Sequence, residues 1–214
     1  MNHRYTIGIV LLLLLCFPQQ TYSQQIHAFI SSGLNLSQIE GDELKGFRQV
    51  GYVGGVGALT ALDKNYRWGL SVEALFSQRG AYNNSIDPYY GRITLNYIDI
   101  PLLFHYQDPY GGMLLGAGVC YGRLVQQPHG ELAFNPLAYL PDTSDMTFLK
   151  NDLAVVLDMR FTIWKGLQFN IRWQYSLFAV KRDWTFIEYI HNKPHKSVND
   201  FYNHSLTMRL IWQF

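Results

Sequence analysis

Six charged residues alternate with apolar ones in segments where every second side chain points the same way. They are Glu73, Asp99, Asp158, Arg160, Arg172 and Arg209. Carboxylates and guanidinium groups enclosed on one face either lock together as ion pairs or relay protons. A locked network that fills the enclosed space is the favoured interpretation, because conduction needs continuous water. His105 is a further candidate member of this network.

A second candidate for chemistry is the adjacent pair His204 and Ser205. Lipid A deacylase barrels, which are enzymes of similar size, place a histidine and a serine two residues apart and therefore on one face. Adjacent residues of a strand point to opposite faces. A lipid-modifying enzyme is therefore the weakest of the function hypotheses, and no catalytic residue is predicted.

Metal and cofactor sites are not predicted either. His191 and His195, with Asp200 nearby, lie in a segment without helical pattern, so nothing places them on one face as ligands. Solvated loop histidines are the favoured interpretation. No phosphate-binding loop and no nucleophile elbow is found in the sequence, and no cofactor is expected.

The elements that must position the charged residues are strands. From Leu167 to Leu177 every second residue is large and apolar, and polar residues fill the other face. The preceding segment alternates in the same way, and Lys165-Gly166 between them indicates a hairpin. These strands exceed the usual length of about 5 to 6 residues. They match the roughly 9 to 11 residues with which a tilted strand crosses a bilayer.

Eight such strands are expected, joined by connections that are alternately long and short. The expected strands are Ile26–Leu36, Val50–Leu62, Trp68–Ser77, Arg92–Tyr106, Gly112–Tyr121, Val155–Ile163, Leu167–Leu177 and Ser205–Phe214. The long connections are 37–49, 79–90, 126–151 and 179–200, and alternation places all of them at one rim. The sequence therefore predicts an all-β fold, an eight-stranded antiparallel up-and-down transmembrane β-barrel. A short extra pair of strands at 133–140 would make ten strands. Within the expected strand Arg92–Tyr106, Pro101 predicts a bulge or local break.

Aromatic residues gather at the ends of strands next to the short connections. They are Trp68, Tyr106, Tyr110, Trp164, Trp212 and Phe214, with Tyr66 beside them. Such residues typically form a girdle at a membrane interface. The alternative, that they are core aromatics of a soluble sandwich, is disfavoured because so many fall at one rim.

Composition and targeting agree with a membrane barrel. Aromatic residues make up 15% of the chain and charged residues 15%, against roughly 25% charged residues in soluble domains.

Residues 1–23 have the basic end, apolar run and small residues of a secretory signal peptide, with Cys16 leaving a lipoprotein leader as an alternative. Residues 24–214 form one barrel domain. Removing Arg4 leaves 16 basic residues against 16 acidic ones, so no nucleic-acid partner is expected. Cys120 is then the only cysteine, which excludes an intramolecular disulfide.

Short motifs in the predicted strands resemble the PorT-like outer-membrane barrel family of Bacteroidota. They are Gly33-Leu34-Asn35-Leu36, Phe76-Ser77-Gln78-Arg79-Gly80, Tyr97-Ile98-Asp99-Ile100-Pro101-Leu102-Leu103, Gly116-Ala117-Gly118 and Tyr121-Gly122. The resemblance runs in order along the mature chain. It implies a small outer-membrane barrel, and the family's namesake is tied to type IX secretion and gliding. No catalytic residues come with it.

The function expected from these observations is that of a structural or interaction protein of the outer membrane. Its surroundings would be outer-membrane lipid and lipopolysaccharide, and a protein partner would be held by the long loops, since loops on a rigid scaffold commonly bind. The resemblance adds an accessory role in secretion. A small-solute porin-like channel is the alternative.

Overall fold

The computed structural model describes residues 26–41, 46–83, 91–110, 112–126, 147–190 and 193–214. Its strands are β1 (Ile26–Glu40), β2 (Gln49–Ala61), β3 (Trp68–Asn83), β4 (Gly91–Gln107), β5 (Met113–Gln126), β6 (Asn151–Trp164), β7 (Leu167–Ser176), β8 (Lys181–Ile190) and β9 (Lys193–Gln213). No helix in these ranges is long and apolar enough to cross a membrane. The predicted signal peptide and the segment 133–140 lie outside the described residues.

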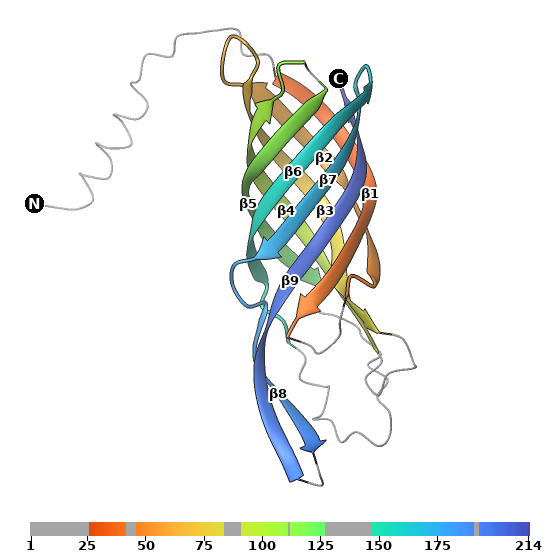
Figure 1. Cartoon of the computed structure of the whole chain (residues 1–214), viewed down its shortest axis with the longest axis vertical. Helices are drawn as coiled ribbons and strands as arrows, with labels where there is room; N and C mark the ends of the chain where they lie inside the picture. Colours follow the sequence, from red (N-terminus) through yellow and green to blue (C-terminus); the bar gives the residue numbers. More distant parts are fainter. Residues whose placement is uncertain (1–25, 42–45, 84–90, 111, 127–146, 191–192) are drawn as a thin grey trace, which may run out of the picture.

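The sheet closes on itself through its first and last strands. Neighbours from β1 to β7 pair in sequence order, and β9 pairs with β7 on one side and with β1 on the other. All pairings are antiparallel, so β1–β7 and β9 form a barrel of eight strands (Figure 1). Among the described strands β8 pairs only with β9, and the two extend beyond the barrel as a ribbon. The predicted eight-stranded antiparallel barrel is confirmed.

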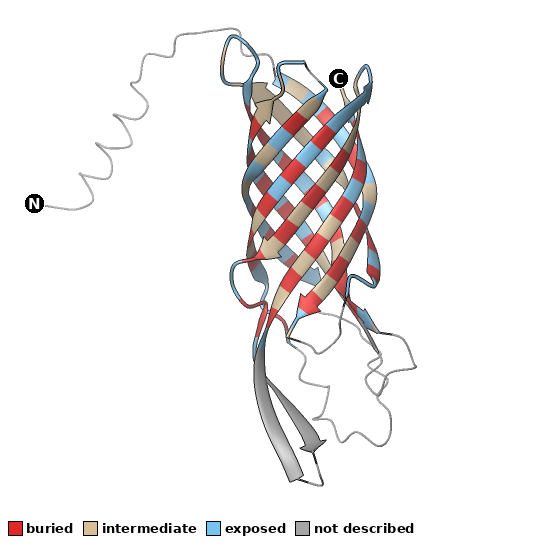
Figure 2. Ribbon diagram, in the orientation of Figure 1, coloured by how far each residue is buried: buried red, intermediate tan, exposed pale blue. Residues whose placement is uncertain are grey.

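Each barrel strand alternates between buried and exposed residues (Figure 2). On β4, Tyr97 and Asp99 are buried whereas Ile98 and Ile100 are exposed. Because this alternation has a period of two, a slip of one residue would turn every buried polar side chain outward. The alternation also assigns β2, whose facing the sequence left open, since Val53 is buried and Val56 is exposed.

The strands reach further than predicted at the rim with the long connections. Arg79, placed in a loop by the sequence, lies inside β3, which continues to Asn83. The predicted loop 179–200 instead contains β8 and the beginning of β9. Polar side chains at this rim look like loop residues in the sequence. Their backbone nevertheless continues the ladder, so the barrel extends past its apolar band.

Pro101 breaks one ladder without a bulge. The β3–β4 pairs pass from Val72–Leu102 to Leu75–Asp99 without a change of register, so the β3–β4 ladder is interrupted beside Pro101, which has no backbone N–H to donate. The register shift on β4 lies at Asn96 and Tyr97, in its ladder with β5. The predicted local break is therefore present, and the bulge lies elsewhere.

The predicted aromatic girdle lies at the end of the barrel that carries the short turns and the C-terminus (Figure 1). Trp68 stacks on Phe104 with ring centroids 5.1 Å apart and also contacts Tyr106. Trp164 and Trp212 are exposed at the ends of β6 and β9, and Tyr110 and Phe214 are exposed in the turn and at the terminus. The position suits a girdle, and contact with lipid remains a prediction.

Three hydrogen-bonded pairs on the outer surface mark the opposite boundary of the apolar band. Each pair joins residues that lie directly across from each other on neighbouring strands. The pairs are Gln38–His204, Gln78–Asn96 and Arg123–Asn151.

The apolar band between the two boundaries has the width of a bilayer core. Ten positions separate Trp68 from Gln78 on β3 and Asn96 from Tyr106 on β4. Between them the outward residues of β4 are apolar, namely Ile98, Ile100, Leu102 and Phe104. This spacing matches the roughly 9 to 11 residues that a tilted strand needs to cross a membrane.

The outward face of β4 gives a test of this band. We expect Leu102→Arg to destabilise the barrel by about 2–4 kcal/mol, because it places a charge in hydrocarbon near the middle of the bilayer. Asn96→Arg, on the same face at the boundary, should cost only about 0–1 kcal/mol. Urea unfolding in phospholipid vesicles measures both. Equal losses would mean that the β4 face does not contact hydrocarbon.

Candidate functional site

The lumen is the candidate functional site because the barrel encloses its charged side chains there in layers. From the short-turn end inward come a polar pocket, a cluster with three arginines, a second ion cluster and an apolar cap, with a small apolar cluster on one wall between the two ion clusters. Along β4 the inward residues passing through these layers are Gln107, His105, Leu103, Pro101, Asp99, Tyr97 and Leu95. The order follows from the alternation, since every second residue of each strand contributes to the next layer.

Glu73 is the centre of the three-arginine cluster. Its Oε1 lies 2.8 Å from Arg160 Nη2 and 2.7 Å from Arg172 Nη2, and its Oε2 lies 2.7 Å from Arg209 Nη1. All four side chains are buried. Charge-assisted contacts of this kind are roughly twice as strong as neutral hydrogen bonds, so the carboxylate of β3 ties together three strands from the other side of the barrel.

Asp158 is the second carboxylate of the same cluster. It accepts hydrogen bonds from Arg160 Nε at 3.0 Å, Arg172 Nε at 2.7 Å and Asn170 Nδ2 at 3.0 Å. Asn170 in turn accepts one from Arg209 Nε at 2.6 Å. The register produces this arrangement, because Asp158 lies directly opposite Arg172 and Asn170 directly opposite Arg209.

Arg79 organises the second ion cluster, nearer the rim with the long connections. It forms an ion pair with Asp99 and lies 3.1 Å from Asp152 Oδ2. Asn203 donates hydrogen bonds to Asp152 and to the Tyr97 hydroxyl, both at 3.2 Å. The Arg79 guanidinium also lies 5.0 Å from the centre of the Tyr97 ring.

The two clusters differ in formal charge. Three arginines face two carboxylates in the first, a formal excess of +1, and one arginine faces two carboxylates in the second, a formal excess of −1. Four guanidinium groups thus balance four carboxylates. Between the two clusters, on the wall formed by β4, β5 and β6, lies a small apolar cluster of Leu103, Cys120, Ala154 and Val156.

The six charged residues predicted from the sequence are all buried inside the barrel, in two groups. Glu73, Asp158, Arg160, Arg172 and Arg209 meet in the first cluster, whereas Asp99 belongs to the second. The sequence analysis missed two members of the second cluster, Arg79 and Asp152. The two-residue alternation along each strand could have identified them. Arg79 continues the inward positions of β3, and Asp152 continues those of β6.

His105 lies at the bottom of the polar pocket and outside the ion pairs. Its Nε2 is 2.7 Å from the Ser71 hydroxyl, and both residues are buried. The neighbouring Gly116 leaves room for the imidazole, because a Cβ atom at this position would overlap the ring. Gly116 of β5 therefore provides the space that the His105 imidazole occupies in the lumen.

The end of the lumen near the long connections is closed by an apolar cap. Its buried residues come from five strands and from the segments before β6 and β8. They are Ile39, Ala81, Ile93, Leu95, Tyr97, Leu124, Phe148, Val180 and Phe201. None is more than 5% exposed. This packing leaves the second ion cluster beneath it without contact with water at that end.

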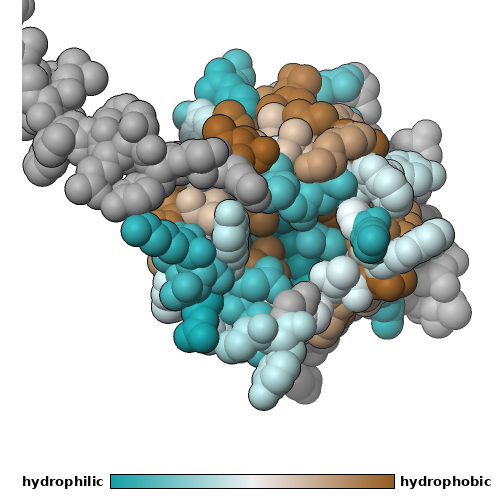
Figure 3. All heavy atoms as spheres, turned by 90° about the horizontal axis from the view of Figure 1, so that it is seen from above, coloured by the Kyte–Doolittle hydropathy of each residue, from teal (hydrophilic) through white to brown (hydrophobic). Residues whose placement is uncertain are grey.

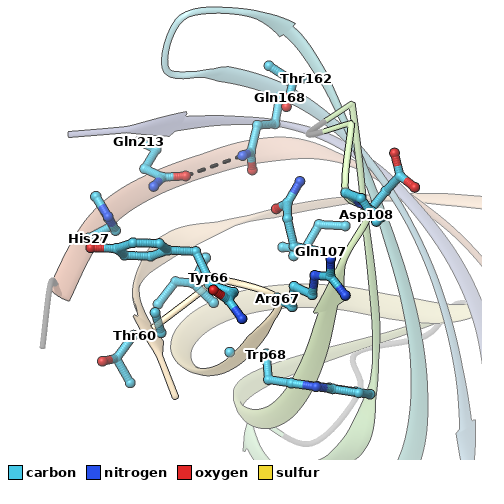
Figure 4. A pocket seen from close by; sticks show the side chains of 16 residues that line it. His27, Thr60, Tyr66, Arg67, Trp68, Gln107, Asp108, Thr162, Gln168 and Gln213 are labelled. Carbon is cyan, nitrogen blue, oxygen red and sulfur yellow. Dashed lines mark hydrogen bonds between the residues drawn. The ribbon is translucent and has the colours of Figure 1, made fainter. Parts of the chain in front are cut away.

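The other end opens into a polar pocket of about 570 Å³. Viewed from this end, polar surface gathers in the middle of the barrel (Figure 3). Figure 4 shows side chains from several strands around the pocket, among them His27, Thr60, Gln107, Gln168 and Gln213.

The pocket is blind. On six strands the next inward residues are buried, at 2% exposure or less. They are Phe29, Ser71, His105, Arg160, Asn170 and Ile211. On β2 and β5 the next inward residues are Gly57 and Gly116, and the rings of Phe29 and His105 occupy the space beside them. Arg160 lies over the Phe29 ring, 4.9 Å from its centre, so the three-arginine cluster supports this floor.

His204 and Ser205 lie on opposite faces of β9, as their spacing predicts. Ser205 is buried in the lumen, whereas His204 lies on the outer surface with its Nε2 2.6 Å from the Trp173 indole nitrogen. Tyr175 beside it donates to Glu40 at 2.8 Å. These residues extend the outer boundary, a second aromatic rim that the sequence analysis did not identify.

The histidines considered as metal ligands are not brought into a described site. His191 lies outside the described residues, and His195 is on the part of β9 whose side chains are not described. Within the described ranges no group of three or more His, Cys, Asp or Glu side chains could hold a metal ion.

The two ion clusters should respond differently to loss of one carboxylate charge. Glu73→Gln leaves three buried arginines facing Asp158, and we expect it to lower the free energy of unfolding by about 3–5 kcal/mol. Asp99→Asn should cost less, because Arg79 keeps Asp152 as its partner. Urea titrations of the refolded protein in vesicles compare the two. A larger loss for Asp99→Asn would contradict the assignment of the excess charges.

Several solved outer-membrane proteins are similar in shape. The attachment invasion locus protein Ail of Yersinia pestis is 13% identical with a TM-score of 0.48, covering 88% of this chain and 98% of that one. Neisserial surface protein A is 10% identical with a TM-score of 0.46, covering 90% and 100%. OprG of Pseudomonas aeruginosa is 16% identical with a TM-score of 0.42, covering 89% and 97%. At these values the likeness carries no functional information.

The sequence itself matches the family model of the outer membrane protein beta-barrel domain over residues 8–214. No curated protein matches it significantly. The family match includes every barrel strand, and it does not distinguish PorT-like proteins of Bacteroidota, so that narrower resemblance stays a prediction. The chain therefore belongs to the outer membrane protein beta-barrel domain family and is a protein of the bacterial outer membrane.

Proposed function

We propose that this protein is a closed structural barrel that presents an interaction surface outside the cell. The observation that carries the proposal is the contrast between its two parts. The lumen is filled by two ion clusters beneath an apolar cap, whereas β8 and the beginning of β9 extend as a ribbon beyond the rim. A barrel of this size has an interior just filled by side chains, which leaves the projecting ribbon for binding.

The ribbon offers strand edges to a protein partner. Within the described strands β8 pairs with β9 alone, so its other edge carries backbone groups without a strand partner. An isolated two-stranded ribbon is marginally stable in water. Extended peptides commonly add to such edges through main-chain hydrogen bonds. We therefore propose that the partner supplies an extended segment that completes the sheet.

The biological setting proposed for this interaction is assembly or secretion at the envelope. The support is the resemblance of the strand motifs to PorT-like barrels, whose namesake is tied to type IX secretion. Outer-membrane lipid and lipopolysaccharide are the proposed surroundings of the barrel wall. We propose no enzymatic role, because Ser205 points into the packed lumen, away from His204.

A small-solute channel is the competing function, and conductance separates the two. We expect no steady current from the purified protein in planar bilayers, because side chains at 2% exposure or less close the floor of the pocket. An unrelated porin in the same bilayers serves as the positive control. A stable open state of porin size would overturn the closed-barrel proposal.

The interaction itself is tested by photo-crosslinking in intact cells. A crosslinking residue at Thr185 on β8 should yield one reproducible product, and the same residue at Asn65 in a short turn should not yield it. Replacing residues 183–198 by a short loop should abolish binding of that partner and leave the barrel folded, since β1–β7 do not pair with β8. Binding that survives this replacement would refute the ribbon as the site.

A further inference from the structure

The wall of the blind pocket at the short-turn end combines apolar side chains with neutral hydrogen-bonding groups. Side-chain amides and hydroxyls come from several strands and turns. They are Asn65, Tyr66, Gln107, Thr162, Gln168 and Gln213. The charged side chains in the wall are Arg67 and Asp108, one of each sign. The pocket therefore suits a ligand without net charge that both donates and accepts hydrogen bonds.

One wall atom lacks a partner. Gln168 Nε2 donates to Gln213 Oε1 at 3.2 Å, whereas the buried Gln168 Oε1 has no hydrogen-bond partner. A buried polar atom without a partner costs free energy. A ligand hydroxyl would satisfy this atom, so its position points to a hydroxyl-bearing ligand.

A strained residue holds an aromatic ring at the mouth. Among the described residues other than glycine, Tyr66 alone has a positive φ, at 56°. The turn holds it there, because the Tyr66 N–H donates to the Asp63 carbonyl at 3.2 Å, and the Trp68 N–H donates to the Asp63 carboxylate at 2.8 Å. Backbone strain of this kind clusters at ligand-binding sites. The Tyr66 ring lies beside His27 (Figure 4).

We propose that this pocket binds a neutral saccharide of one or two rings from the periplasmic side. A sugar presents hydroxyls for Gln168 and a C–H face for the Tyr66 ring. The volume of about 570 Å³ lies within the range of about 300–1,000 Å³ typical of small-molecule sites. Short turns face the periplasm in bacterial barrels. The sugar reaches the pocket either free in solution or as the end of a cell-wall glycan, and the floor stops it from passing through.

Titration of the refolded mature chain in detergent micelles tests this proposal. The probes are glucose, N,N′-diacetylchitobiose and glucose 6-phosphate, followed by saturation-transfer NMR. We expect one or both neutral sugars to bind, and the phosphate ester to bind more weakly than glucose. Preference for diacetylchitobiose assigns the cell-wall glycan as the source, and preference for glucose assigns the free sugar. Binding of neither, or stronger binding of the phosphate ester, would overturn the proposal.

Two pocket variants and one control locate the binding. Gln168→Leu removes the unpaired acceptor, and Tyr66→Gly removes the ring while relieving the positive φ, so the second variant keeps the test valid if the first folds poorly. Each should weaken binding about tenfold, the effect of losing one good contact. Gln38→Leu, on the outer surface near the other rim, should bind as the wild type does. Equal affinity in all of these proteins would exclude the pocket.

Discussion

Burial of charge inside a closed sheet is the constraint on which the rest of this structure depends. A lone guanidinium or carboxylate costs several kcal/mol when it leaves water, and four of each are enclosed in this lumen. Their pairing tolerates little displacement, because Asp158 meets Arg172 and Asn170 meets Arg209 directly across neighbouring strands. The register of β6, β7 and β9 is therefore set by the contents of the lumen as well as by the backbone ladders.

The outer surface imposes the same register for a different reason. In the three-arginine cluster each charged residue is followed by an apolar residue on the outer face, so a strand slipped by one residue would lose its ion pairs and expose charge to lipid. The two ends of the lumen are not equivalent, however. One is packed with apolar side chains, and the other keeps a polar hollow above a buried floor. The barrel is thus a receptacle open to one compartment, with its projecting strands in the other.

The two-residue alternation of polar and apolar side chains made the barrel predictable from the sequence. The polar residues at the strand ends hid how far the strands extend. The alternation on β4 and β7 gave both the fold and the facing of Asp99, Arg172 and their neighbours. The sequence could not show that Asp99 sits apart from the three-arginine cluster, because its layer depends on the stagger between strands. Arg79 was missed because a polar run resembles a loop, and the polar pocket because its walls come from turns and strand ends far apart in the chain. The β8–β9 ribbon lacks a long alternating pattern, so its pairing was not foreseen.

The closing strand has an electrostatic consequence for assembly. Without β9, the lumen residues of β1–β7 comprise four carboxylates and three arginines, a deficit of one positive charge. Arg209 arrives on the last strand and supplies it. By formal charge, the lumen side of β1–β7 taken alone is therefore anionic, and Arg209 on β9 brings it to neutrality. Closure of the sheet and neutrality of its interior are thus linked through one arginine.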